Sequence, residues 1–169
     1  MLTLAFPCAA DETAVMAYRA AFVQAGDSLD GTCNLNRHEN YADWLAMVTD
    51  NRSEETVRPG LVPASTMLAW DDGKLVGMID IRHRLNDYLL QFGGHIGYSV
   101  HPACRRQGYA TRMLALALDE CRRLGLSRVM VACDRDNPAS ARTILKNGGV
   151  LENEVPEDGS ITQRYWIEL

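Results

Sequence analysis

Residues 93–149 constrain the fold of this 169-residue chain more than any other part. An apolar stretch at residues 94–100 predicts a strand, and a turn, a long amphipathic helix, a second apolar strand at 128–133 and a short helix follow it. A helix that joins two strands in this way is typical of a right-handed crossover between parallel neighbours. We therefore expect a strand–helix–strand unit in the middle of a sheet.

The turn inside this unit has the composition of an anion site. The helix opens at Thr111, directly after Arg105, Arg106, a glutamine, Gly108, a tyrosine and Ala110. The first N–H groups of a helix have no intrahelical acceptor, and the helix dipole places positive charge beside them. The glycine and alanine allow close backbone approach, and arginines are planar phosphate donors. This junction predicts a pyrophosphate site.

The other periodic segments complete one domain over residues 1–169. Helical patterns occupy residues 10–25, 37–48, 111–124 and 137–147. Strand patterns occupy residues 2–5, 65–70, 74–82, 94–100, 128–133, 150–155 and 161–169, and Asp71-Asp72-Gly73 predicts a hairpin. The expected fold class is α+β, with a central twisted mixed sheet of six to seven strands flanked by about four helices.

Composition excludes several classes of protein. A hydrophobic fraction of 47% with 23% charged residues is ordinary for a globular domain, and no apolar run approaches the roughly 20 residues that span a bilayer. The five cysteines are odd in number and lack CxxC spacing, so the sequence predicts neither a disulfide framework nor a metal site. The start of the chain lacks the pattern of a secretory signal, and we expect a cytoplasmic protein.

The charge is unevenly distributed. The net charge is −5, yet the stretch from His101 to Met130 is rich in arginine. A short basic patch with few interleaved aromatic residues suits a compact anion better than RNA or DNA, so nucleic acid binding is the weakest alternative. The chain contains neither the Gly-Lys-Ser/Thr of a P-loop nor a G-x-G-x-x-G triplet at the turn.

Arg105, Gly108 and Ala110 fill the pattern Q/R-x-x-G-x-G/A, which resembles the signature of the GNAT superfamily of acyl-CoA-dependent N-acetyltransferases. The preceding strand resembles the fourth strand of that family. Asn137 and the residues up to Gly149 resemble its fourth helix and the following turn. The runs at residues 82–86 and 93–98 resemble a subgroup whose amine substrates are largely unassigned.

The resemblance implies acetyl-CoA as cosubstrate, with no metal. Backbone amides of the turn would receive the pyrophosphate, and the backbone edge near Ser99 and Val100 would pair with the pantetheine amides. Asn137 and Ser140 match positions that touch the pantetheine arm. The implied cofactor-binding residues are Ser99, Val100, Arg105, Arg106, Gln107, Gly108, Tyr109, Ala110, Thr111, Asn137 and Ser140.

Two departures from the family concern catalysis. Ile144 occupies the place of a helical tyrosine that protonates the departing thiolate in many relatives. Tyr98, Tyr109 or Tyr165 could substitute, and a thiol pKa of about 8.5 also makes the thiolate a tolerable leaving group without an acid. The fourth strand carries no glutamate. His95 is the nearest titratable residue there and is our candidate base, beside Tyr98 as candidate acid. The alternatives for the base are His83, Asp80, Glu39 and a solvent relay.

The leading prediction is an enzyme that moves an acetyl group from acetyl-CoA to a primary amine of a small molecule or peptide. The amine would attack the thioester directly in a ternary complex. The alternative is an acetyl-CoA-binding sensor without turnover, which the two departures favour. We expect no nucleic acid or membrane partner, and the sequence leaves a homodimer open.

Overall fold

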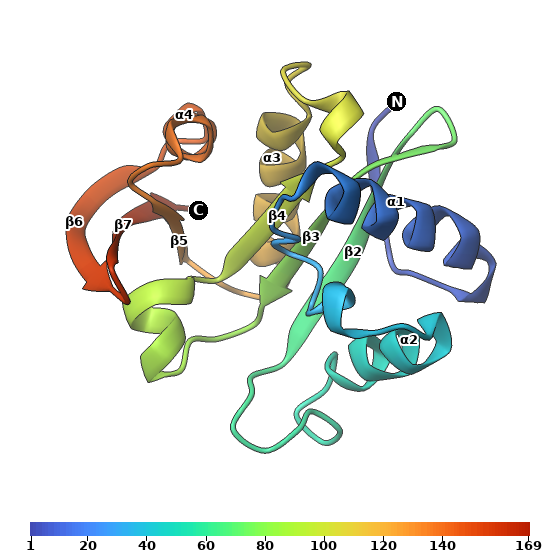
Figure 1. Ribbon diagram of the computed structural model, residues 1–169. Helices are drawn as coiled ribbons and strands as arrows, with labels where there is room; N and C mark the ends of the chain where they lie inside the picture. The colour runs from blue at the N-terminus through green and yellow to red at the C-terminus, as the bar shows by residue number, and fades with distance from the viewer.

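The computed structural model describes residues 1–169, which form seven strands and four α-helices (Figure 1). The strands are β1 (Thr3–Ala5), β2 (Ala64–Asp71), β3 (Lys74–Arg82), β4 (Ile96–Val100), β5 (Arg128–Asp134), β6 (Val150–Glu157) and β7 (Ser160–Glu168). The helices are α1 (Glu12–Ala25), α2 (Tyr41–Asp50), α3 (Tyr109–Arg123) and α4 (Pro138–Lys146). The predicted α+β fold class is confirmed. None of the helices has the length and apolar character that crossing a membrane requires.

The strands form two hydrogen-bonded sheets. Strands β1-β2-β3-β4 make an antiparallel sheet in that order, and β5-β7-β6 make a second one. Figure 1 shows the two sheets side by side, with β4 and β5 at their facing edges. The expected parallel pairing of β4 and β5 is wrong, because the two strands share no ladder and their sheets meet at an isolated antiparallel bridge between Gly94 and Val131.

Gly94 explains why the contact is confined to one point. Its φ of +66° is accessible mainly to glycine, and a Cβ there would lie 2.6 Å from the Met130 carbonyl oxygen. The His95 N–H donates to that same carbonyl at 2.7 Å. Past this bridge β4 and β5 form no further ladder, so the unpaired edges of the two strands face each other across a gap.

Helix α3 covers one face of the first sheet. Its apolar side, predicted from the periodicity, is fully buried in a core with β3 and β5 and includes Met113, Leu114 and Ala117. The helix starts two residues earlier than predicted, because Gly108 serves as its N-cap. Gly125 follows the last turn at φ +82°, as expected for a helix C-terminus.

Helices α1 and α2 cover the opposite face. Tyr18, Phe22 and Trp44 form a second core with Leu68 and Met78 of the hairpin. The predicted first helix is confirmed. The second starts later than predicted, because the Asn40 side chain accepts hydrogen bonds from the backbone N–H groups of the first turn.

Two connections between strands were not predicted in this form. Residues 85–93, for which no helix or strand was predicted, contain a π-helical turn, Leu89–Gly93, whose Leu90 carbonyl accepts two hydrogen bonds from Arg164 of β7. The expected loop at residues 156–160 is a tight hairpin instead, because β6 continues through Pro156 to Glu157. The hairpin predicted between β2 and β3 is confirmed.

Candidate functional site

The gap between the two sheets holds a groove of about 1020 Å³. Its floor is the edge of β4. One wall is the loop at residues 27–31 after α1, and the other comprises the end of β5 and the inner side of α4. The turn between β4 and α3 closes one end. The π-helical turn and the β6–β7 hairpin line the other end.

The turn presents a row of free donors to the groove. The backbone N–H groups from Arg106 to Thr111 donate to no carbonyl of the chain, and the next residue, Arg112, donates to the carbonyl of Gly108. Six consecutive unpaired N–H groups therefore precede or open α3, at the positive end of its dipole. Such an arrangement binds phosphate oxygens.

Two left-handed residues shape this turn. Gly108 has φ +78° and Arg106 has φ +63°. An L-residue in this region costs roughly 1–2 kcal/mol, so the conformation of Arg106 is held against its local preference. A Cβ added at Gly108 would meet no atom within 4 Å. The backbone at Gly108 is therefore open to a ligand on the side where other residues carry a side chain.

The two arginines of the turn play different parts. Arg105 Nη1 lies 2.7 Å from the Asp27 carboxylate, and its Nε donates to the Val100 carbonyl at 3.3 Å. Arg105 thus fastens the loop at residues 27–31 to the end of β4. Arg106 is exposed and has no ion pair, which leaves its guanidinium available to an anion. The Gln107 side chain turns back toward the Ala103 carbonyl.

Helix α4 adds cations that the sequence analysis missed. Arg142 and Lys146 line the groove near the turn. Asn147 ties the helix to the turn by donating to the Thr111 carbonyl at 3.2 Å. Because both cations are on α4, only its packing against α3 brings them to the turn. Their helical spacing of four residues was the one signal in the sequence.

The free edge of β4 supplies further backbone groups. The His101 N–H donates to the Val76 carbonyl, and the Arg82 N–H donates to the His95 carbonyl. Since the bonding direction alternates along an antiparallel strand, the backbone groups of Tyr98 and Val100 face away from β3 and into the gap. The gap-facing amides therefore belong to Tyr98 and Val100, and those of Ser99 face β3.

The side chains of β4 alternate between the two layers. Ser99 is buried on the α1 side, where its hydroxyl accepts a hydrogen bond from Tyr18 at 3.0 Å. Tyr98 lies on the α4 side, where its hydroxyl is 2.7 Å from the Ser140 hydroxyl. Burial raises the pKa of Tyr98 to about 12, so this phenol stays protonated at neutral pH. Tyr98 and Ser140 together line the groove.

Asn137 and Ser140 meet at the start of α4. The Asn137 side-chain oxygen accepts the Ser140 N–H at 3.1 Å, as an N-cap does. Both residues line the groove, and the amide nitrogen of Asn137 has no partner in the chain. The cap fixes the first turn of α4 beside β4, which sets the position of the Ser140 hydroxyl.

His95 is not brought together with these residues. Its side chain is buried outside the groove lining, and its Nδ1 accepts the Met130 N–H at 2.9 Å. Burial lowers the pKa of His95 to about 4. A neutral ring that accepts a backbone hydrogen bond fastens β4 to β5, and nothing in this geometry directs its second nitrogen at the groove.

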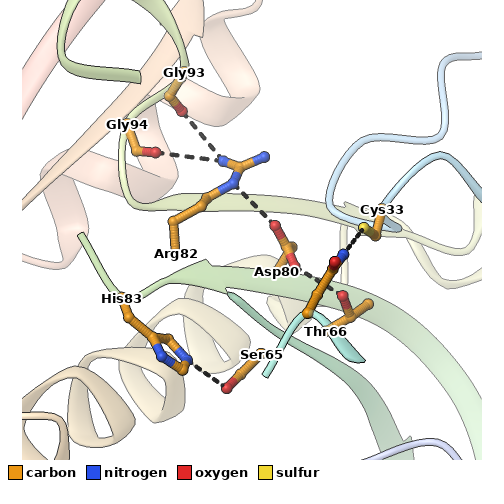
Figure 2. A network of polar contacts seen from close by, with 9 residues as sticks. Cys33, Ser65, Thr66, Asp80, Arg82, His83, Gly93 and Gly94 are labelled. Carbon is orange, nitrogen blue, oxygen red and sulfur yellow. Dashed lines mark hydrogen bonds and ion pairs between the residues drawn. The ribbon is translucent and has the colours of Figure 1, made fainter. Parts of the chain in front are cut away.

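The alternatives to His95 are likewise engaged. His83 Nε2 pairs with the Ser65 hydroxyl at 2.9 Å, and Asp80 is buried against Thr66 and Arg82 (Figure 2). Tyr109 donates to Asp71. Glu39 and Tyr165 lie outside the groove lining. Among the predicted acid candidates, Tyr98 alone combines a groove position with a phenol that is not bound to a carboxylate.

Ile144 does not reach the groove. It is fully buried in the core beneath α3, and a Cβ at Gly149 would lie 2.4 Å from its Cγ2. The neighbouring Thr143 faces the groove instead. The absence of a helical tyrosine thus leaves Tyr98 as the hydroxyl beside α4.

A third residue that sequence reasoning missed is Arg82, at the end of β3. Its guanidinium lines the end of the groove opposite the turn. Nε lies 2.9 Å from Asp80, and Nη1 points at the Gly93 and Gly94 carbonyls (Figure 2). An opposite charge two residues away on a buried strand, where both side chains share a face, was a usable signal in the sequence.

Comparisons with known proteins agree with this arrangement. The profile of the acetyltransferase (GNAT) family matches residues 29–148. No curated protein sequence matches the chain. YncA, an acetyltransferase from Salmonella typhimurium solved with its cofactor acetyl-CoA, has 19% identity and a TM-score of 0.68 over 99% of this chain and 94% of that one.

Two further solved structures share the fold. RimJ from Mycobacterium smegmatis, in complex with CoA-disulfide, is 21% identical, with a TM-score of 0.73 over 99% of this chain and 81% of that one. The spermidine/spermine N-acetyltransferase SpeG from Vibrio cholerae, in mutant forms, is 15% identical, with a TM-score of 0.65 over 99% and 95%. At these identities the likeness concerns the fold.

Proposed function

This chain belongs to the acetyltransferase (GNAT) family, and we propose that it acetylates a primary amine of a small molecule or a peptide. It is an acetyl-CoA-dependent N-acetyltransferase by family. The observation that carries the proposal is the row of unpaired N–H groups from Arg106 to Thr111 at one end of a groove bounded by the free edge of β4.

The residues present fit the phosphates of coenzyme A. The six N–H groups, the open side of Gly108 and the exposed Arg106 offer donors and space for a pyrophosphate. Arg142 and Lys146 add positive charge on the opposite wall. The phosphates therefore fix one end of the cosubstrate at the turn, and the groove leads from there along β4.

The edge of β4 orients the arm and the thioester. The outward N–H groups of Tyr98 and Val100 and the Tyr98 carbonyl are free to pair with amides of an extended arm, as an added strand does, while the Val100 carbonyl already accepts a hydrogen bond from Arg105. An N–H of this edge would donate to the thioester carbonyl oxygen and stabilise negative charge that develops there. The amine nitrogen then forms a bond to the carbonyl carbon, and the carbon–sulfur bond breaks.

Tyr98 is our candidate for the proton donor to sulfur. Its phenol stays protonated because its pKa is raised to about 12, and Ser140 holds it at the groove wall. The thiol of coenzyme A has an ordinary pKa near 8.5, so a modest donor suffices. Strand β4 and the residue before it, His95, present no base to the acceptor end of the groove. The amine proton therefore leaves through water.

The test is acceptor-dependent release of thiol from acetyl-CoA. The purified chain is mixed with acetyl-CoA and a panel of amines, amino acids and short peptides, and products are identified by the mass of an added acetyl group. We expect acetylation of at least one amine. Tight binding of acetyl-CoA without thiol release for any acceptor would contradict the proposal and support the sensor alternative that the buried Ile144 favours.

A further inference from the structure

We propose that the acceptor carries a carboxylate close to its amine, as an α-amino acid does, and that the guanidinium of Arg82 binds this carboxylate. The proposal rests on the amine acetylation proposed above and names the chemical class of the acceptor. It is carried by the free donors of Arg82, by its place beside Gly97, and by the charges at that end of the groove.

Arg82 is held in place, but some of its N–H donors have no partner. Of its five N–H donors, Nε faces Asp80 at 2.9 Å and Nη1 faces the Gly93 and Gly94 carbonyls at 3.3 and 3.5 Å. Nη2 has no hydrogen-bond partner in the chain, and Figure 2 shows it as the nitrogen without a dashed line. Two N–H groups of a fixed guanidinium therefore remain for a ligand.

The partner carboxylate of Arg82 is locked by its own contacts. Asp80 is 4% exposed, and its second oxygen accepts a hydrogen bond from the Thr66 hydroxyl at 2.8 Å. Because both oxygens of Asp80 are engaged, Arg82 keeps one orientation, with Nε toward Asp80 and Nη2 away from it. A preorganised arginine of this kind recognises carboxylates with little further loss of side-chain freedom.

Gly97 leaves the guanidinium open to the groove. A Cβ at Gly97 would lie 3.4 Å from Nη1 and 3.5 Å from Nη2 of Arg82, and 3.4 Å from the Gly31 nitrogen. Any longer side chain at Gly97 would fill the space between β4 and the loop at residues 27–31. Because position 97 is a glycine, no side chain of β4 stands in front of the guanidinium, and both Arg82 and Gly97 line the groove.

The distance to the reacting carbon limits the size of the acceptor. Gly97 directly precedes Tyr98, whose outward N–H is a candidate donor to the thioester carbonyl. One strand residue spans about 3.3 Å, so the carboxylate site lies roughly one or two residues along the strand from the thioester. An amine and a carboxylate on the same or the next carbon match this short separation better than a long diamine does.

The surrounding charges fit a zwitterion. Asp30 and Glu157 line the groove together with Arg82. Glu157 accepts hydrogen bonds from the Tyr88 hydroxyl at 3.2 Å and from the Thr162 hydroxyl at 2.5 Å. These carboxylates attract the ammonium form of the acceptor, and Arg82 attracts its carboxylate. A simple cation would have to approach Arg82 at the cost of like-charge repulsion.

The experiment compares amino acids with their amides. Acetylation of a panel of L-amino acids and the matching amino acid amides is followed by thiol release, in the wild type and in Arg82→Gln. Arg84→Gln is the matched control, because Arg84 pairs with Glu54 outside the groove. We expect the wild type to use its best amino acid with a kcat/KM roughly 10 to 100 times that of the amide, the range of one charge-assisted hydrogen bond.

The variants separate recognition from structural support. Arg82→Gln should lose this preference through a higher KM for the acid, so that its ratio of kcat/KM for acid over amide falls toward one even where loss of the Asp80 ion pair lowers both rates, and Arg84→Gln should keep the wild-type ratio. An equal fall on both substrates, or a wild type that acetylates other amines without favouring the acid over the amide, would overturn the proposal. A wild type that acetylates no amine at all would instead refute the proposed function.

Discussion

Replacement of Gly108 by alanine is the sharpest perturbation of the turn. Gly108 has φ +78°, and a Cβ there would meet no atom of the chain. The substitution therefore causes no clash within the protein. Its cost to folding is the backbone strain of an L-residue in the left-handed region, roughly 1–2 kcal/mol.

The same helix provides a matched control at its other end. Gly125 has φ +82° and also has no atom within 4 Å of an added Cβ. Gly125→Ala should cost the same 1–2 kcal/mol, because it imposes the same strain at a position outside the groove. The two variants thus differ only in what their Cβ meets when acetyl-CoA binds.

We expect Gly108→Ala to weaken acetyl-CoA binding and Gly125→Ala to leave it unchanged. The Cβ at position 108 would stand where a phosphate approaches, and a turn that relaxes its strain would misdirect the N–H groups of residues 108–111. Loss of one charge-assisted hydrogen bond, about 1.5–3 kcal/mol, raises the dissociation constant roughly 10- to 100-fold.

Isothermal titration calorimetry with acetyl-CoA measures the affinity, and urea unfolding measures the stability of each variant. Equal dissociation constants for Gly108→Ala and Gly125→Ala would refute the assignment of this turn to the pyrophosphate. A much larger loss of stability in Gly108→Ala than in Gly125→Ala would refute the argument that its Cβ meets open space.

The other predictions concern three side chains of the turn and of the strand before it. Arg106→Ala should weaken acetyl-CoA binding about 10-fold and make its salt dependence shallower, because an exposed unpaired cation is removed; calorimetry at two salt concentrations checks this, and an unchanged slope would contradict it. Tyr98→Phe should bind acetyl-CoA as the wild type does but lower kcat about 100-fold, which steady-state kinetics tests; an unchanged kcat would remove Tyr98 as the acid. His95 has a pKa of about 4 in the folded chain and an ordinary value of 6.5 when unfolded, so the unfolded state takes up the proton first and stability falls as the pH drops from 6.5 toward 4. Urea titrations at pH 7.5 and pH 5 measure the free energy of unfolding. Between these two pH values it should fall by about 2 kcal/mol more in the wild type than in His95→Asn, and an equal fall in both would contradict a buried neutral ring.

The elements with strong local signals were predictable. Helix α3 has a continuous apolar side, and the Asp72-Gly73 turn fixes the β2–β3 hairpin, so pattern and turn chemistry agree with the tertiary structure there. The unpaired N–H groups at the N-terminus of α3 follow from the same local reasoning, because no helix can satisfy its own first N–H groups.

The division of the sheet was not predictable from pattern. An apolar strand predicts burial, but it does not specify whether its edge pairs with a neighbour or lines a gap. The separation of β4 from β5 begins at Gly94, which bridges to Val131 and packs so closely on the Met130 carbonyl that a Cβ would not fit. A double glycine before the strand marked a break without revealing which strand lay across it.

The residues at the acceptor end show the same limit. His95 was a reasonable base on its strand position, but its role depends on a backbone N–H of β5 that only the tertiary structure brings near. Arg82 was visible in the sequence as part of a charged strand end. Its open donors depend on Gly97 of β4 and on the loop at residues 27–31, which are remote in sequence.

A crystal structure of this chain with coenzyme A tests the central claim most directly. The account predicts the pyrophosphate oxygens within hydrogen-bond distance of the N–H groups between Arg106 and Thr111, with the arm laid along the outward edge of Tyr98 and Val100. A pyrophosphate bound elsewhere, or an arm that leaves the gap between β4 and β5 empty, would contradict it.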